Sequence, residues 1–148
     1  MEKKYIALLI AILALSFILR VIIINYEWID VDEGNYLYDA KLLSEGARPF
    51  EDFYMKEVFY TSLLAGFGKI FGFTLFLGRF LSVLFSVITI IFIYKIGNEL
   101  DNPRIGLAAA GIYAFMPFTI FWNSLVRESV LGIMLTTIAV YFIIRFAR

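Results

Sequence analysis

The chain has 148 residues, of which 61% are hydrophobic and 18% charged, and its mean hydropathy is +0.84. A soluble domain is about 45–50% apolar, so this composition indicates a membrane-embedded chain. The 13 Lys and Arg balance the 13 Asp and Glu, which excludes the strongly basic surface of a nucleic-acid-binding domain. Because Cys and His are both absent, disulfides, thiol nucleophiles, Cys/His metal sites and a histidine base are excluded as well.

Four apolar segments approach the length that a membrane span needs, which is about 20 residues. We expect transmembrane helices over residues 5–24, 74–96, 105–122 and 129–144. Arg20, near the end of the first, is expected to extend its charged head to the water boundary. Asn102 and Pro103 form a typical N-cap and first helical residue for the third, and Pro117 is expected to kink it. One face of this third span carries small residues that allow close helix packing: Gly106, Ala110 and Ala114.

The distribution of Lys and Arg predicts which side each end of the chain faces. With a cytoplasmic N-terminus, the cytoplasmic segments hold six basic residues: Lys3, Lys4, Lys95, Arg104, Arg145 and Arg148. The segment 25–73 then lies outside, with four basic residues against nine acidic ones. Short cytoplasmic loops carry an excess of Lys and Arg. We therefore expect a multi-pass plasma-membrane protein with both termini in the cytoplasm.

The outer segment 25–73 is too long and too patterned for a plain connector. Apolar residues at helical spacing follow Asp32 and Glu33 and stop near Gly46, which predicts one short helix. The apolar stretch 58–73 is short for a span and suits a helix lying in the membrane interface. A fifth span there would invert the sides of everything after it and remove the Lys/Arg bias. The predicted fold is a single all-α membrane domain with four transmembrane helices and two amphipathic or interfacial helices in one extracytoplasmic loop.

An acidic cluster, Asp30, Asp32 and Glu33, directly follows the first predicted span. One interpretation is that Asp32 caps the following helix, whose N-terminus favours nearby negative charge. The other is that a carboxylate is held at the water–lipid boundary as a base or an ion ligand. Divalent cations such as Mg²⁺ and Mn²⁺ prefer oxygen ligands, so Asp32, Glu33 and the more distant Glu128 are candidate metal ligands.

Three cationic residues lie near the outer boundary of the predicted spans. Lys56 precedes the predicted interfacial helix, Arg79 lies early in the second span, and Arg127 follows the third. Extension of the charged head to the boundary explains each one singly, but together they suit an anionic lipid head group. Glu128 is either a local ion pair of Arg127 or a second acid in the same pocket. Nearby aromatic residues are typical of an interfacial belt, and nothing in the sequence favours a sugar-stacking role for them: Phe50, Phe53, Tyr54, Phe59 and Tyr60.

The order of these elements resembles the N-terminal part of membrane glycosyltransferases of the GT-C fold. The closest resemblance is to the dolichyl-phosphate-mannose–protein mannosyltransferase and aminoarabinose transferase group. Four stretches carry it: DEGNYLYDAKLLSEG (32–46), FYMKEVFYTSLLAGFGKIFG (53–72), LGRFLSVLFSVITIIFIYKIGNEL (77–100) and IGLAAAGIYAFMPFTIFWNSLVRESVLGIML (105–135). Each motif alone is weakly specific, so the resemblance depends on the ordered combination of all four. Family enzymes continue through further spans, so the chain is similar to a fragment, a split-gene product or a reduced relative.

The resemblance implies roles for particular residues. The acid that opens the first outer loop is catalytic in this family, and Asp32 matches it. The Lys in the second half of that loop contacts the lipid phosphate, and Lys56 matches it. Family members usually have Pro after this Lys, whereas Glu57 follows here. They often carry Asp after the third span, where this chain has Arg127 and Glu128.

The resemblance thus implies transfer of a sugar from a polyprenyl-phosphate donor to a lipid, glycan or protein acceptor at the extracytoplasmic face, with inversion. Asp32 would take the proton of the acceptor, and further residues would bind the substrates: Glu33, Lys56, Arg79, Arg127 and Glu128. The alternative is a non-catalytic membrane assembly partner or an inactive truncated relative, with a second chain completing the bundle. A small ion-transport subunit is disfavoured because the middles of the four predicted spans lack charged residues.

Overall fold

The structure of the chain is a computed structural model that describes residues 3–26, 28, 30–100 and 102–148. In this part of the chain all regular secondary structure is helical. Glu27 and Ile29, which belong to the predicted outer segment, lie outside the described residues. The helices, in chain order, are α1 (Lys3–Ile23), α2 (Val31–Ser44), α3 (Val58–Phe71), α4 (Leu75–Glu99), α5 (Pro103–Phe115), α6 (Pro117–Trp122) and α7 (Glu128–Phe146).

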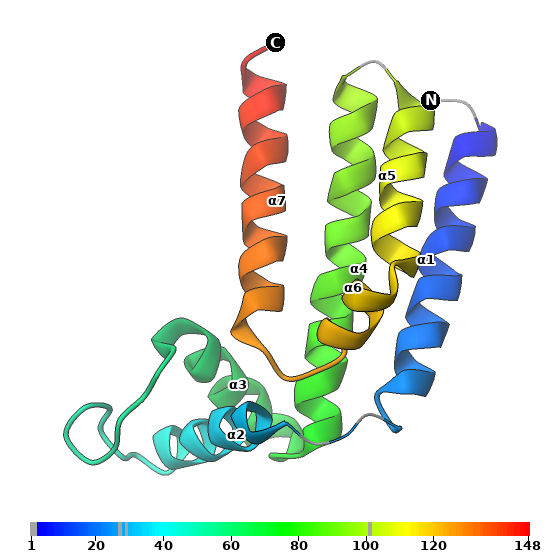
Figure 1. Cartoon of the computed structure of the whole chain (residues 1–148). Helices are drawn as coiled ribbons and strands as arrows, with labels where there is room; N and C mark the ends of the chain where they lie inside the picture. The colour runs from blue at the N-terminus through cyan, green and yellow to red at the C-terminus, as the bar shows by residue number, and fades with distance from the viewer. Residues whose placement is uncertain (1–2, 27, 29, 101) are drawn as a thin grey trace.

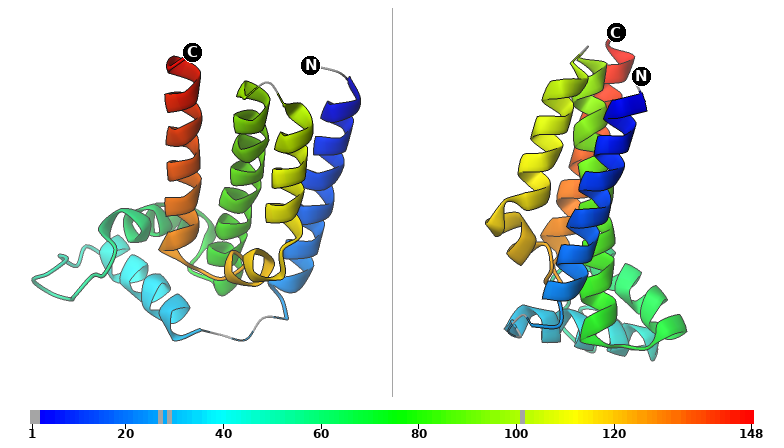
Figure 2. Two further views of the ribbon diagram at one scale, coloured as in Figure 1. Left: turned by 45° about the horizontal axis from the view of Figure 1, so that its top comes forward. Right: turned by 90° about the vertical axis from the view of Figure 1, so that its right-hand side faces the viewer.

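Helices α1, α4, α5 and α7 stand side by side, and α4 packs against the other three (Figures 1 and 2). Both termini lie at one end of this bundle, while α2 and α3 lie across the opposite end (Figure 1). The short helix α6 also lies toward the α2/α3 end. The bundle therefore has two different ends, one formed by the termini and one formed by the large loop after α1.

Three helices, α1, α4 and α7, are long and apolar enough to cross a membrane. Together with the apolar composition they make the chain an all-α membrane protein. Helix α3, with 14 residues, is apolar but shorter than a span, in keeping with the expectation of a short helix rather than a fifth crossing. Its exposed side is rich in large apolar residues: Val58, Phe59, Phe67, Ile70 and Phe71.

The third predicted span, 105–122, is divided into α5 and α6 around Met116. Pro117 lacks the backbone N–H that would continue the helix. The carbonyl of Tyr113 instead accepts a hydrogen bond from Thr119 Oγ1 at 2.6 Å. The expected kink is therefore a complete break, after which α6 turns away from the axis of α5 (Figure 1).

The expectation that Arg20 extends toward the water boundary is wrong, because its side chain is fully buried. Its Nη1 donates a hydrogen bond to the carbonyl oxygen of Ala114 at 2.8 Å and another to the hydroxyl of Ser16. The break at Pro117 leaves the last carbonyls of α5 without their usual helical partners. Arg20 on α1 binds one of them and so joins α1 to the end of α5.

Two apolar clusters hold the helices together. The first lies at the loop end and joins α2, α3, α4 and α7 through residues such as Tyr36, Tyr60 and Leu81. The second joins α1, α4 and α5. Here the predicted small-residue face is confirmed, since Gly106, Ala110 and Ala114 are all buried. Side chains that small allow the backbones of α4 and α5 to approach closely.

Candidate functional site

The site begins with the N-terminus of α2, which a reciprocal capping box fixes. Asp30 is the N-cap, and its Oδ1 accepts a hydrogen bond from the Asp32 N–H at 3.1 Å. In turn, Glu33 Oε2 accepts a hydrogen bond from the Asp30 N–H at 3.1 Å. The interpretation of Asp32 as the cap is therefore wrong by two residues. An Asp followed three residues later by Glu is a capping-box pattern, so this signal was present in the sequence.

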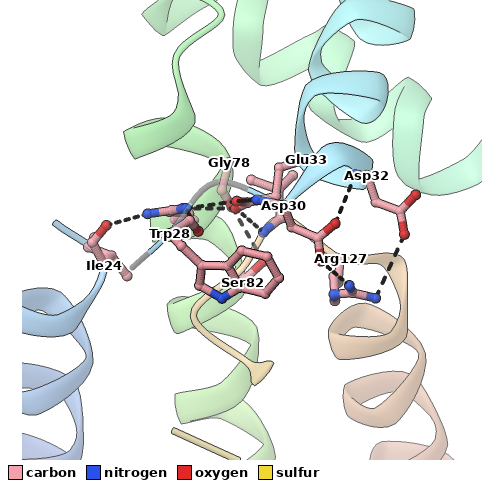
Figure 3. Close-up of polar contacts among 10 residues, drawn as sticks. Ile24, Trp28, Asp30, Asp32, Glu33, Gly78, Ser82 and Arg127 are labelled. Atoms are coloured by element: carbon pink, nitrogen blue, oxygen red, sulfur yellow. Dashed lines mark hydrogen bonds and ion pairs between the residues drawn. The ribbon is translucent and has the colours of Figure 1, made fainter. Parts of the chain in front are cut away.

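Glu33 also forms the central ion pair of the site with Arg79 of α4. Arg79 Nε lies 2.8 Å from Glu33 Oε1, and Arg79 Nη2 lies 2.7 Å from Oε2. The Val126 N–H donates to Oε1 at 2.9 Å. Arg79 donates further to the carbonyls of Ile24 at 2.7 Å and Trp28 at 3.0 Å. These bonds join the end of α1, the start of α2, α4 and the segment before α7 (Figure 3).

This arrangement leaves Glu33 and Arg79 little surface for a substrate. The Glu33 side chain is 0% exposed and that of Arg79 5% exposed. Burial raises the pKa of Glu33, but the bonds from Arg79, Val126 and Asp30 outweigh it, so the pKa lies below its usual range. The predicted substrate contacts of Glu33 and Arg79 stay predictions, and the geometry gives the two residues a positioning role.

Arg127 connects the loop before α7 to the acidic cluster. It forms an ion pair with Asp30, and its Nη1 lies 3.9 Å from Asp32 Oδ2. Figure 3 shows both carboxylates directed toward this guanidinium. Its Cζ lies 4.2 Å from the ring centre of Trp122, a distance typical of a cation–π contact. The pKa of Asp30 is lowered by the Asp32 N–H and also by Arg127.

Glu128, at the first turn of α7, is bound to α2 rather than to Arg127. It accepts a hydrogen bond from the hydroxyl of Tyr36. Burial raises the pKa of Tyr36 strongly, and the negative charge of Glu128 raises it further. Tyr36 therefore stays a neutral donor that fixes the position of the Glu128 carboxylate.

A polar hollow of about 340 Å³ lies between α2 and the loop that follows it. Six residues line it: Asp32, Asn35, Tyr36, Asp39, Tyr54 and Lys56. Asp32 and Lys56, predicted from the sequence to share one site, thus do face the same space. Glu128 accepts a hydrogen bond from Tyr36, which lines the hollow. Arg127 lies next to Asp32, with its Nη1 3.9 Å from Asp32 Oδ2. The sequence-based reasoning missed Asn35, Asp39 and Tyr54.

Hydrogen bonds between Arg48 and Asp52 stabilise the turn that precedes Tyr54 and Lys56 in the loop before α3. The Arg48 N–H donates to Asp52 Oδ2 at 2.7 Å, and the Asp52 N–H donates to the Arg48 carbonyl at 2.9 Å. Met55 is buried, with 1% of its surface exposed. Its chain neighbours Tyr54 and Lys56 are exposed, and both line the hollow.

The three carboxylates predicted as metal ligands do not suit one metal ion. Both oxygens of Glu33 are already occupied by donors from Arg79, Val126 and Asp30. Glu128 accepts from Tyr36. Among the residues that the structure describes, no group of three or more acidic side chains is arranged to hold a metal.

The chain is thus an all-α membrane protein in which carboxylates and a lysine line a polar hollow at one end. The chain belongs to the dolichyl-phosphate-mannose–protein mannosyltransferase family, whose sequence profile matches residues 58–148. This confirms the family resemblance. The matched region contains Arg79, Arg127 and Glu128, whereas Asp32 and Lys56 precede it. No curated protein and no solved structure matches the chain significantly.

Proposed function

We propose that the chain transfers a sugar from a polyprenyl-phosphate donor to an acceptor hydroxyl at the extracytoplasmic face, with inversion at the anomeric carbon. The observation that carries this proposal is that Asp32 and Lys56 line one polar hollow. That hollow lies beside α2, and α2 lies at the end of the bundle opposite the termini (Figure 1). The basic residues of the short segments belong to the end that holds the termini. Because such residues favour the cytoplasmic side, the hollow would face outward.

Asp32 and Lys56 have different roles in a single displacement reaction. The acceptor oxygen attacks the anomeric carbon, the bond from that carbon to the phosphate oxygen breaks, and its electron pair leaves with the phosphate. Asp32 accepts the hydroxyl proton as the new bond forms. Lys56 faces the leaving phosphate and stabilises its developing charge. Attack from the side opposite the phosphate inverts the anomeric configuration.

The ion pairs formed by the three cations support the assignment of Lys56 as the residue that binds the phosphate. Arg79 is paired with Glu33, and Arg127 is paired with Asp30 and Asp32. Lys56 is exposed and forms no ion pair with any residue in the described part of the chain. Its charge is therefore free to bind a lipid phosphate. Arg127, which lies beside Asp32, would hold the base in position during the reaction.

The test measures mannose transfer from dolichyl-phosphate mannose by the full chain in proteoliposomes. Asp32→Asn should reduce the rate by about 10²–10⁴, the usual contribution of a general base. Lys56→Met should weaken donor binding. Glu45→Gln is the matched control, because Glu45 also lies at α2 but forms only an exposed pair with Lys41. Undiminished transfer by Asp32→Asn would remove the proposed mechanism.

A second candidate function is a non-catalytic partner in a larger membrane assembly. A groove of about 590 Å³ lies between α4 and α7, and small residues such as Ser129, Gly132 and Thr136 line part of it. Small residues allow a further helix to approach closely. This role predicts that the chain purifies with another membrane chain and that Asp32→Asn leaves the activity of that assembly unchanged. A loss of activity in that variant would favour catalysis.

A further inference from the structure

We infer that Asn35 and Asp39 form the subsite that binds the hydroxyl groups of the transferred sugar, an inference that rests on the function proposed above. Both residues lie on the face of α2 that carries Asp32, at intervals of three and seven residues. In an α-helix such positions share one face. All three line the polar hollow together with Lys56. The subsite thus adjoins the base and the proposed phosphate contact.

The charge of the hollow favours an uncharged, hydroxyl-rich group over a second phosphate. Asp32 and Asp39 bring two carboxylates, and Lys56 brings one ammonium group. A phosphate deep in the hollow would meet two like charges, so it belongs at the Lys56 side. Carboxylates accept hydrogen bonds from hydroxyls, and the Asn35 amide both donates and accepts them. These are the interactions that a sugar ring can satisfy.

The size of the hollow indicates which group occupies it. A volume of 340 Å³ is near the lower limit of ligand pockets, about 300–1,000 Å³. It therefore suits one monosaccharide rather than a complete lipid-linked substrate. Because the transferred sugar is bonded to the phosphate that Lys56 contacts, it is the group that must lie between Lys56 and Asp32. Asp39 then faces hydroxyls remote from the anomeric carbon.

Asp39 has no structural role that would otherwise explain it. It forms no hydrogen bond or ion pair with any residue that the structure describes. It is partly buried, and this burial raises the pKa of its carboxyl group. A carboxylate that loses water without gaining a partner weakens the folded state. A substrate hydroxyl would supply the missing partner.

The experiment compares two lipids, dolichyl-phosphate mannose and dolichyl phosphate, for binding to the full chain in nanodiscs. A hydrogen bond to a charged group contributes enough free energy to change affinity by about tenfold. The unchanged chain should therefore prefer the mannosylated lipid by about that factor. Asp39→Asn and Asn35→Ala should lose this preference while binding dolichyl phosphate as before. Lys56→Met should weaken both lipids equally, and Glu45→Gln should change neither.

The outcomes distinguish failure of the sugar subsite from failure of the proposed transferase function. If Asp39→Asn keeps the preference for mannose, or loses affinity for both lipids equally, the sugar subsite is overturned while the phosphate contact of Lys56 stands. If neither lipid binds the unchanged chain, the proposed function fails together with the subsite. If mannose transfer depends on Asp32 but the mannose preference does not depend on Asp39, only the subsite is lost.

Discussion

Arg79 of α4 and Glu33 of α2 form a two-pronged ion pair in which the carboxylate is completely buried. Glu33 directly follows Asp32 in the chain. The ion pair fixes the start of α2 against α4, while Asp30 and Val126 satisfy the remaining acceptor capacity of Glu33. The position of the proposed base therefore depends on a buried ion pair.

Replacing Glu33 with Gln should strongly destabilise the fold. The change removes the Glu33 charge from the buried Arg79 guanidinium, and breaking such a buried pair typically costs about 3–5 kcal/mol. Thermal unfolding of the full chain in detergent would measure the effect. The double variant Glu33→Leu, Arg79→Met should recover part of the loss, since apolar replacements of a buried pair are often tolerated.

The matched control for this prediction is Lys41→Gln. Lys41 and Glu45 form an exposed pair at 3.9 Å in which each side chain is 58% exposed. Exposed pairs contribute about 0–1 kcal/mol, so the melting temperature should hardly change. A Glu33→Gln variant as stable as Lys41→Gln would contradict the structural role of the buried pair.

Acid should destabilise the loop end of the bundle. The pKa values of Glu33 and Asp30 are lowered in the folded chain. Their contribution is therefore complete above the unfolded values of about 4, and it is lost as the pH falls through the lower folded values. Melting temperatures between neutral pH and pH 2.5 should show this decline. Glu33→Gln should flatten it, whereas a melting temperature that rises below about pH 4 would contradict the prediction.

Much of the fold could be predicted because local signals agree with the packing. Asn102 caps α5 through a hydrogen bond from the Ile105 N–H, and Pro103 is its first residue, as expected. The break at Pro117 was recognised only as a kink. Its extent depends on Thr119 and Arg20, which bind the freed carbonyls from a later helix and from α1. Such long-range partners have no local sequence signal.

Part of the candidate site could also be predicted from the sequence. Asp32 and Lys56 were identified through the family resemblance, and both line the hollow. Asp39 was missed because a single acid on an exposed helix face is ordinary. For Glu128 the sequence left two alternatives open, a local ion pair with Arg127 or a second acid in the same pocket. Arg127 pairs with Asp30, 97 residues away, and Glu128 accepts from Tyr36. Contacts over such a sequence separation have no local sequence signal.

Asp39→Asn should raise the stability of the chain slightly while abolishing the sugar preference proposed above. Burial raises the pKa of Asp39, so its ionised form is less favourable in the folded state than in the unfolded state. This cost is present at neutral pH and disappears as the pH falls through the folded pKa. The gain in melting temperature should therefore be larger at pH 7 than at pH 4. A clear loss of stability at pH 7 would mean that Asp39 has a structural partner.

The contact between α4 and α5 should tolerate no added side chain. A Cβ atom on Gly97 would lie 2.3 Å from the Cα of Gly106, so Gly97→Ala requires the two backbones to separate. We expect a loss of about 1–3 kcal/mol, as for overpacked cores. Gly132→Ala on α7 is the matched control, because nothing lies within 4 Å of its added Cβ. There the better helix propensity of Ala should raise stability by about 0.5–1 kcal/mol. Equal responses of the two variants in thermal unfolding would contradict the close approach of α4 and α5.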